Sequence, residues 1–323
     1  MASPGRSSRL GSARPPHSSY SLHGAGPFRT TAQLLIIFNP HSGRARAIGR
    51  AAVERALTAR GLDYELAVPG SPEEAAAAAT EAAAAGRTVV AAGGDGTVHI
   101  VANGALAAGN ADAELGVLPL GSGNDFAASL GRVAASLDAA AAALARPRRL
   151  RVDVGQVHGR EYFINGLGIG FDAEVVRTKE GKSVGALGYT PTVFRKILSY
   201  EPRNYRVRWS GGEVDGPGLM LAVMNGVSEG GGFRLAPDAA LDDGALDICW
   251  IDPINLWQFV RYVSAVRRGT HGALPMVRAW RCSGLSVESA APISYHMDGE
   301  YRQLERGQPL TVELHSRRLQ VIV

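Results

Sequence analysis

The chain has 323 residues, a length that favours two domains, and 46% of its residues are hydrophobic, enough to fill two cores. No apolar run approaches the roughly 18 residues of a membrane-spanning helix, which excludes an integral helical membrane protein. Of the 34 basic residues, four arginines lie within residues 1–30, where no acid balances them, and the other 30 face 30 acidic residues. The rest of the chain is therefore neutral, which gives no support to a nucleic-acid partner, and we expect none.

The cysteines indicate the cellular compartment of the protein, and the composition of the first residues indicates where its ordered part begins. The two cysteines, Cys249 and Cys282, lie in apolar, strand-like contexts without metal-ligand spacing, so we expect a reducing compartment and a cytoplasmic protein. Residues 1–31 are rich in Ser, Gly, Pro, Arg and His and have no hydrophobic periodicity. We expect a disordered extension there.

From residue 32 onward, strand-like and helix-like segments alternate. Short apolar runs predict strands at residues 34–38, 64–68, 88–92 and 114–119. The intervening patterns predict helices at residues 45–60, 71–86 and 98–106. Such a series is typical of an α/β domain with a doubly wound, mainly parallel sheet, which binds ligands at the carboxyl ends of its strands. We assign residues 32–149 to this nucleotide-binding domain.

Three of these strands are followed by loops that suit phosphate binding. Glycine permits a tight turn and a close backbone approach, and the helix that begins behind each loop adds partial positive charge. Because the carboxyl ends of parallel strands share one edge of the sheet, we expect the loops to meet there and bind one nucleotide. The candidate residues are Asn39, Pro40, Ser42 and Gly43, then Gly93, Gly94, Asp95, Gly96 and Thr97, and finally Gly121, Ser122, Asn124 and Asp125.

After a basic hinge at residues 146–149, the pattern changes to short strands divided by Gly, Pro and Asp. These strands are expected at residues 150–157, 162–166, 205–209, 219–225, 246–251, 285–288 and 293–297. Helical segments near 184–200 and 255–268 interrupt them. The pattern predicts an all-β domain, a sandwich with helical insertions, over residues 150–309. Two more strand-like runs follow within 310–323.

Motifs spread along the chain together resemble the catalytic domain of the diacylglycerol kinase and sphingosine kinase superfamily, and in particular its soluble bacterial lipid kinases. Those in the first half are Asn-Pro-x-Ser-Gly at 39–43, Gly-Gly-Asp-Gly-Thr at 93–97 and Pro-Leu-Gly-Ser-Gly-Asn-Asp-Phe at 119–126. Those in the second half are Gly-Phe-Asp-Ala at 170–173, the triple-glycine stretch at 230–239 and Asp-Gly-Glu at 298–300.

The resemblance implies an architecture and an activity. The active site would lie between the nucleotide-binding domain and the β-sandwich domain, and the last strands, within residues 310–323, would return to the first domain. The implied reaction transfers the γ-phosphate of ATP to a lipid hydroxyl, with diacylglycerol or a related lipid alcohol as the expected substrate. Phosphoryl transfer needs positioning, neutralisation of charge by Mg²⁺ and a base near the acceptor hydroxyl.

Three carboxylates are candidates for catalysis. The resemblance assigns proton acceptance to the Asp-Gly-Glu segment, so Glu300 is the expected general base. Asp298 is expected to bind Mg²⁺ or a water chain, or to be the base itself. Asp95 is the third candidate, because sphingosine kinases are thought to use the aspartate of the Gly-Asp-Gly turn.

An acidic loop holds Asp238, Asp242, Asp243 and Asp247, and such oxygen-rich loops favour hard cations. The soluble bacterial relatives carry a structural Mg²⁺ at this place. The resemblance implies Asp243 as its ligand here, with backbone carbonyls of Ala240 and Ala245. An acidic turn without metal is the alternative.

A lipid kinase without a membrane span has to meet its substrate at the membrane surface, so we expect peripheral contact with the inner face of the membrane. Residues 255–268 place apolar side chains at helical spacing with arginines elsewhere, and residues 194–208 mix basic and aromatic side chains. For the first segment, packing on the protein's own core is the alternative. The sequence leaves the oligomeric state open, a homodimer included.

Three other functions compete with this reading. NAD kinase shares the Gly-Gly-Asp-Gly turn and the general architecture, but the Asn-Asp-Phe, triple-glycine and Asp-Gly-Glu motifs argue against it. A long-chain-base kinase would differ only in its substrate. A lipid-binding or regulatory protein with weak catalysis is the third alternative, and the presence of Asp95, Asp298 and Glu300 argues against it.

Overall fold

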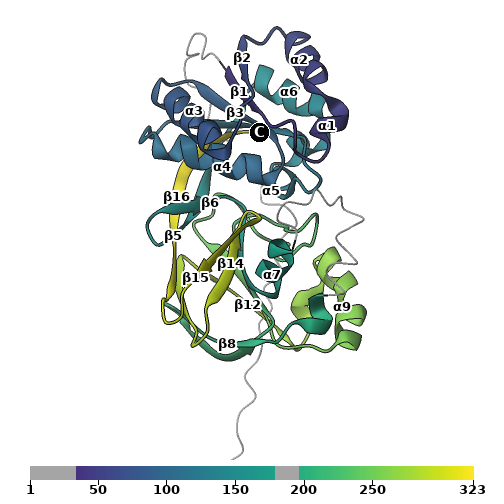
Figure 1. Ribbon diagram of the computed structural model, residues 1–323, viewed down its shortest axis with the longest axis vertical. Coiled ribbons are helices and arrows are strands. Elements are labelled where there is room, and N and C mark those ends of the chain that lie inside the picture. Colours follow the sequence, from purple (N-terminus) through teal and green to yellow (C-terminus); the bar gives the residue numbers. More distant parts are fainter. Residues whose placement is uncertain (1–33, 179–195) are drawn as a thin grey trace, which may run out of the picture.

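The computed structural model describes residues 34–178 and 196–323, which form an N-terminal and a C-terminal lobe, shown above one another in Figure 1. The expected disordered extension, residues 1–31, and most of the expected helix at 184–200 lie outside the described residues. Within the ranges that are described, no helix is both long and apolar enough to cross a membrane.

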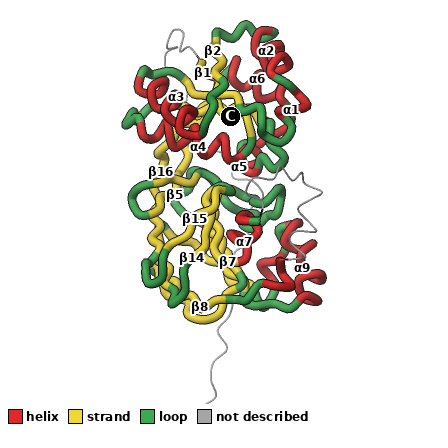
Figure 2. The backbone as a smooth tube through the Cα atoms, in the orientation of Figure 1, coloured by secondary structure: helices red, strands yellow, loops and turns green. Residues whose placement is uncertain are grey.

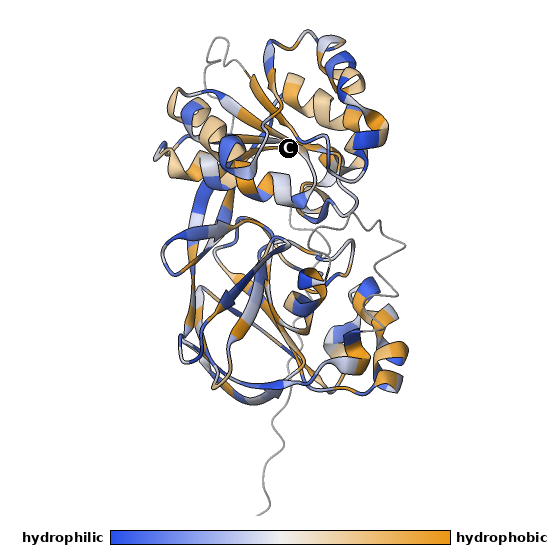
Figure 3. Cartoon of the chain, viewed as in Figure 1, coloured by the Kyte–Doolittle hydropathy of each residue, from blue (hydrophilic) through white to orange (hydrophobic). Residues whose placement is uncertain are grey.

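The N-terminal lobe is built on a parallel sheet with the strand order β2-β1-β3-β4. These strands are β1 (Leu34–Phe38), β2 (Tyr64–Ala67), β3 (Thr88–Gly93) and β4 (Glu114–Pro119). Every residue of β1, β3 and β4 is buried, because helices cover both faces of the sheet, and Figure 3 shows these strands as the apolar centre of the lobe. The doubly wound α/β fold expected from the sequence is confirmed.

The helices of this lobe are α1 (Ala45–Ile48), α2 (Arg50–Thr58), α3 (Pro72–Ala84), α4 (Asp95–Ala107), α5 (Asp125–Ser129) and α6 (Leu137–Ala145). Ser71 caps α3 as expected, its hydroxyl accepting a hydrogen bond from Glu74 N at 3.2 Å. The single helix expected at 45–60 is wrong, because Gly49 has a φ of 75° and separates α1 from α2. A residue with a φ of 75° and a ψ of 155° cannot continue a right-handed helix.

The C-terminal strand returns to the first lobe, as the family resemblance implies. Strand β16 (Leu310–Ile322) pairs in parallel with β4 and antiparallel with β5 (Arg149–Val157). The two strand-like runs expected within 310–323 are one long strand whose register shifts between His315 and Leu319. We propose the domain boundary near the start of β5, where the basic hinge ends.

The C-terminal lobe is a sandwich of antiparallel strands (Figure 2). One sheet has the order β12-β11-β10-β7-β14-β15, and its strands are β7 (Gly166–Gly170), β10 (Met220–Met224), β11 (Leu246–Ile251), β12 (Val277–Cys282), β14 (Ile293–Met297) and β15 (Glu300–Leu304). The other layer contains β6 (Glu161–Phe163), β8 (Arg203–Trp209), β9 (Gly212–Gly218) and β13 (Gly284–Glu288), together with β5 and β16. Buried side chains of both sheets, Trp250 among them, form one core between them. The expected β-sandwich is confirmed.

Two helices flank the sandwich on the side that faces away from β16 in Figure 1: α7 (Phe171–Arg177) and α9 (Leu256–Arg268). Helix α9 was expected from its apolar spacing. It begins with a capping box, in which Asn255 Oδ1 accepts from Gln258 N at 2.9 Å and Gln258 Oε1 accepts from Asn255 N at 3.0 Å. It ends at Gly269, which is left-handed with a φ of 74°.

Candidate active site between the lobes

The three glycine loops lie side by side at the carboxyl edge of the parallel sheet, as expected. Leu120 N donates to Gly93 O at 2.7 Å, and Arg44 N donates to Leu120 O at 2.8 Å. The loops pack backbone against backbone: a Cβ on Gly121 would stand 2.5 Å from the Cα of Gly94, and one on Gly43 would stand 2.7 Å from Ser122 N. Glycine is therefore required where the loops touch.

Side chains from the predicted nucleotide-binding set fasten these loops to one another. Asn39 Nδ2 donates to Thr97 Oγ1 at 3.0 Å, and Ser42 Oγ donates to Leu120 O at 3.3 Å. Asn124 is left-handed, with a φ of 58°, and its Oδ1 accepts from Gly121 N at 2.8 Å. Pro40 lies in the turn between Asn39 and Ser42. Helix α4 begins among these loops, and the N–H groups of its first turn have no partners within the helix, as an anion site requires.

Asp95, the first residue of α4, holds the third loop in place. Its Oδ2 accepts from Asn124 N at 2.8 Å, and its Oδ1 accepts from Phe126 N at 3.2 Å. Burial, together with the nearby charge of Asp125, raises the pKa of Asp95 to about 7. Both of its oxygens are thus occupied by the loop that it supports.

Asp125 connects the two lobes. Its carboxylate accepts hydrogen bonds from Gly231 N at 2.7 Å, Gly232 N at 2.9 Å and Ser228 Oγ at 3.0 Å, all in the loop that follows β10. Both glycines have a positive φ, 83° and 101°, which turns their N–H groups toward this carboxylate. Burial raises the pKa of Asp125, and the three donors oppose that effect. The carboxylate is directed at the C-terminal lobe in this structure.

Asp298, the first residue of the Asp-Gly-Glu turn, is buried and has a φ of 49°. Its Oδ1 accepts from Asn165 N at 2.9 Å and Gly166 N at 3.0 Å, and its Oδ2 accepts from Ile164 N at 3.0 Å. This also explains why the strand expected at 162–166 is wrong. The chain turns there to present three N–H groups to Asp298, which separates β6 from β7.

His99 completes a buried network that sequence reasoning missed. Its Nδ1 lies 2.9 Å from Asp298 Oδ2 and its Nε2 lies 3.1 Å from Glu161 Oε1, which also accepts from Arg302 at 2.7 Å. Burial alone would lower the pKa of His99, but Asp298 and Glu161 raise it to about 9, so the imidazole is protonated at neutral pH. His99 follows Asp95 by four residues and therefore lies on the same face of α4. That spacing is the signal that could have found it.

Glu300 differs from the other two catalytic candidates. It is the first residue of β15, its side chain is half-buried, and its carboxylate has no hydrogen-bond partner among residues 34–178 and 196–323. A Cβ on Gly96 would stand 2.6 Å from Glu300 Oε1. The glycine of the Gly-Asp-Gly-Thr turn thus leaves room for this carboxylate beside the N terminus of α4. Of the three carboxylates, Glu300 has a free oxygen next to the three loops.

The positive charge beside the acidic loop at 238–247 is the guanidinium group of Arg281. Asp243 forms an ion pair with Arg281, whose Nε also lies 3.5 Å from Asp247 Oδ1. Behind the loop, Asp153 accepts from Gly244 N at 2.7 Å and Arg317 N at 2.6 Å. Magnesium binding by Asp243 with the carbonyls of Ala240 and Ala245 stays a prediction, and Arg281 would have to share Asp243 with the ion.

An apolar pocket lies in the C-terminal lobe, where α7, α9 and the strands β10 and β11 meet. Its walls include Phe171 of α7, Met220 of β10, Ile251 of β11 and Phe259 and Val263 of α9. Asp172 and Glu229 also line it. A pocket of this composition suits the hydrocarbon part of a lipid.

Comparisons with known proteins agree with this arrangement. Residues 33–157 match the family described as diacylglycerol kinase catalytic domain, and residues 166–323 match the family described as YegS C-terminal NAD kinase beta sandwich-like domain. A diacylglycerol kinase of Bacillus subtilis is 31% identical over 230 residues, which cover 69% of this chain and 74% of that protein. A probable lipid kinase YegS-like of Pseudomonas aeruginosa is 33% identical over 212 residues, covering 64% and 68%.

Two further similarities support less, the first because its alignment is short and the second because its sequence identity is low. A probable lipid kinase YegS-like of Chromohalobacter salexigens is 40% identical over 160 residues, so the match spans 48% of this chain and about half, 51%, of that protein. The crystal structure of a diacylglycerol kinase from Bacillus anthracis superposes with a TM-score of 0.67 over 91% of this chain and 98% of its own. Its sequence identity is 19%, so this likeness concerns the fold alone.

Proposed function

This chain belongs to the diacylglycerol kinase family of lipid kinases, and we propose that it transfers the γ-phosphate of ATP to the hydroxyl of diacylglycerol or a related lipid alcohol. The observation that carries the proposal is the position of Glu300. A carboxylate with no partner in the described part of the chain lies against Gly96, at the N terminus of α4, where the three glycine loops meet.

In the proposed reaction, the loops at 39–43, 93–97 and 121–125 hold the ATP phosphates through backbone N–H groups. Glu300 removes the proton from the lipid hydroxyl as that oxygen attacks the γ-phosphorus, the bond from the γ-phosphorus to the β–γ bridging oxygen breaks, and ADP leaves. Mg²⁺ bound with ATP would supply the charge neutralisation that such a transfer needs. Asp298 fixes the turn that carries Glu300, and Asp95 fixes the loop at 121–126, so we assign both to positioning.

We propose that α9 brings the protein to the cytoplasmic face of the membrane. It exposes three apolar side chains, Trp257 (75% exposed), Val260 and Leu256, and it carries no acidic residue. Arg261, Arg267 and Arg268 are exposed on the same helix. Because the opposite face of α9 lines the apolar pocket, a lipid could pass from the bilayer into the pocket along this helix.

Replacing Trp257 with Asp should weaken binding to anionic phosphatidylglycerol vesicles by about tenfold or more, since the indole leaves the interface and a negative charge enters it. Cosedimentation with vesicles measures the effect. Val68→Asp is the control, because Val68 is an exposed apolar residue of the other lobe. Equal losses in both variants would contradict a membrane role for α9.

The activity itself is tested by incubating the purified protein with ATP labelled at the γ-phosphate, Mg²⁺ and mixed micelles of single lipid alcohols. We expect label in phosphatidic acid when diacylglycerol is the acceptor. Thin-layer separation identifies the product. Failure with glycerolipids, long-chain bases and NAD alike would refute the kinase proposal. The apolar walls of the pocket argue against NAD as the acceptor, because its polar groups would find few partners there.

A further inference from the structure

A second cleft lies at an open edge of the β-sandwich, on the side of β5 and β16 and away from α9 (Figure 1). Its volume is about 530 Å³, within the range of about 300–1,000 Å³ that is usual for sites of small organic molecules. It is lined by the hairpin between β5 and β6, by β14, and by the segment that joins β15 to β16. Because these walls come from both layers of the sandwich, the cleft leads in between the two sheets.

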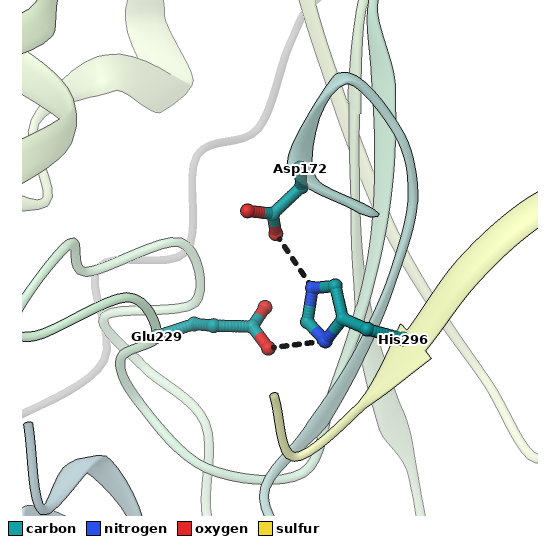
Figure 4. Close-up of side chains that lie close together, drawn as sticks. All are labelled: Asp172, Glu229 and His296. Carbon is teal, nitrogen blue, oxygen red and sulfur yellow. Dashed lines mark hydrogen bonds and ion pairs between the residues drawn. The ribbon is translucent and has the colours of Figure 1, made fainter. Parts of the chain in front are cut away.

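The cleft and the apolar pocket beside α9 lie on opposite faces of β14. Successive side chains of a strand point to opposite faces of its sheet. His296 points toward Asp172 and Glu229, two residues that line the apolar pocket, and its Nε2 lies 3.1 Å from Asp172 Oδ2 (Figure 4). The two neighbours of His296 in the strand, Tyr295 and Met297, line the cleft instead. The cleft is therefore separate from the pocket that suits the lipid substrate.

The inner wall of the cleft is apolar. Val157, Tyr295 and Met297 are buried, and they belong to the core between the two sheets. Leu304, at the end of β15, packs against that core and is partly exposed. Water finds few hydrogen-bond partners at such a surface, whereas the transfer of an alkyl chain out of water onto it is favourable. The inner part of the cleft therefore suits an alkyl chain.

The mouth of the cleft carries one charged group without a partner. Arg160 is exposed there, and its guanidinium group has no hydrogen-bond or ion-pair partner among residues 34–178 and 196–323. Glu161, which also lines the cleft, is already paired. Its Oε1 accepts from Arg302 Nη2 at 2.7 Å and lies 3.1 Å from His99 Nε2. An anionic group at the mouth would therefore meet an unpaired cation.

Backbone contacts hold the mouth in shape. His158 N donates to Thr311 O at 3.1 Å, and His158 Nδ1 lies 3.2 Å from Thr311 Oγ1, so the hairpin turn is fastened to β16. Arg160 N donates to Val157 O at 3.0 Å and closes the turn. A preformed site needs little ordering when its ligand binds, so less of the binding free energy is lost.

We propose that this cleft binds an amphiphile with one long alkyl chain and an acidic headgroup, the chain lying along Tyr295, Met297 and Leu304 and the headgroup at Arg160. A carboxylate and a phosphate monoester both accept hydrogen bonds from a guanidinium group, so a fatty acid and a lysophosphatidic acid share the required chemistry. An alcohol with the same chain would lack the ion pair with Arg160. This binding is independent of the proposed phosphoryl transfer, because it takes place in a different cavity.

Binding of a fluorescent fatty acid to the purified full-length protein tests the proposal, without ATP and below the critical micelle concentration. Oleate, oleoyl lysophosphatidic acid and oleyl alcohol are each used to displace it. We expect one saturable site, at which the better of the two acids binds at least about tenfold more tightly than oleyl alcohol. The acid that binds more tightly identifies the headgroup as a carboxylate or a phosphate.

The substitution Arg160→Gln should weaken binding of the preferred acid by about tenfold and that of oleyl alcohol by less than about threefold, since only the acid loses its partner. Damage to the fold would weaken both alike. The control is Arg55→Gln, which changes an exposed arginine of α2 in the other lobe and should leave both affinities as in the wild type. Absence of saturable binding, equal affinity for acid and alcohol, or unchanged binding of the acid by Arg160→Gln would each overturn the proposal.

The position of the bound chain can be tested on the wild-type protein alone. A fatty acid that carries a diazirine at the end of its chain, irradiated in complex with the protein, should label the inner wall of the cleft at Tyr295, Met297 or Leu304. Mass spectrometry of the digested protein identifies the labelled residues. Label confined to the apolar pocket beside α9, at Phe259 or Val263, would contradict the proposal.

Discussion

Replacing Glu300 with Gln should lower kcat for lipid phosphorylation by about 10²–10⁴-fold, because the amide cannot accept the proton of the lipid hydroxyl. Glu300 is the candidate carboxylate whose oxygens make no hydrogen bond in the described structure and which lies against the N terminus of α4. The side chain keeps its size, so Gly96 still accommodates it. Initial rates at saturating ATP and lipid measure the effect, and circular dichroism checks the fold.

The matched control for this substitution is Glu305→Gln, which removes an exposed carboxylate just beyond the same strand, β15. We expect Glu305→Gln to keep wild-type kcat, and both variants to bind ATP as the wild type does. A folded Glu300→Gln protein with near-normal turnover would exclude Glu300 as the base. The proton would then have to go to Asp95 or Asp298, both of whose oxygens accept hydrogen bonds here.

The sequence predicts those parts of the molecule that depend on local pattern. Apolar runs and helical spacing place β1, β4, β11, β14 and α9 at or near their observed bounds. It misses β9, β12 and β15, because edge strands rich in Gly, Pro or polar residues lack the alternation that marks a half-buried strand. The order of the glycine motifs is also enough to bring three loops to one edge, since the topology of a parallel sheet does so by itself.

What each carboxylate contacts could not be predicted, because the partners come from distant parts of the chain. Asp125 belongs to a loop of the N-terminal lobe, yet its acceptor oxygens are used by N–H groups more than a hundred residues later. Asp298 and His99 are brought together only when the turn between β14 and β15 meets α4 of the other lobe. The motif pattern therefore yields a set of candidate carboxylates, and the hydrogen bonds distinguish the positioning residues from the free one.

Replacing Asp298 with Asn should reduce the free energy of unfolding by about 3–5 kcal/mol near neutral pH, because it removes one partner of a buried ion pair and leaves the charge of His99 less well compensated. Asp298 is buried and accepts hydrogen bonds from Ile164, Asn165 and Gly166 as well as contacting His99. Urea denaturation followed by circular dichroism measures the change.

The pH dependence separates the contribution of the ion pair from that of the backbone hydrogen bonds. The pKa of His99 is raised from 6.5 to about 9 in the folded protein, so the stabilisation that it gives is complete below pH 6.5 and is lost as the pH rises through 9. A shift of this size corresponds to about 3 kcal/mol. The pKa of His296 is also raised to about 9, so wild-type stability should fall over this window from two sources. His99→Gln should remove only the contribution of His99, so the free energy of unfolding should fall less steeply with pH than in the wild type. A fall as steep as that of the wild type would contradict a protonated His99 between Asp298 and Glu161.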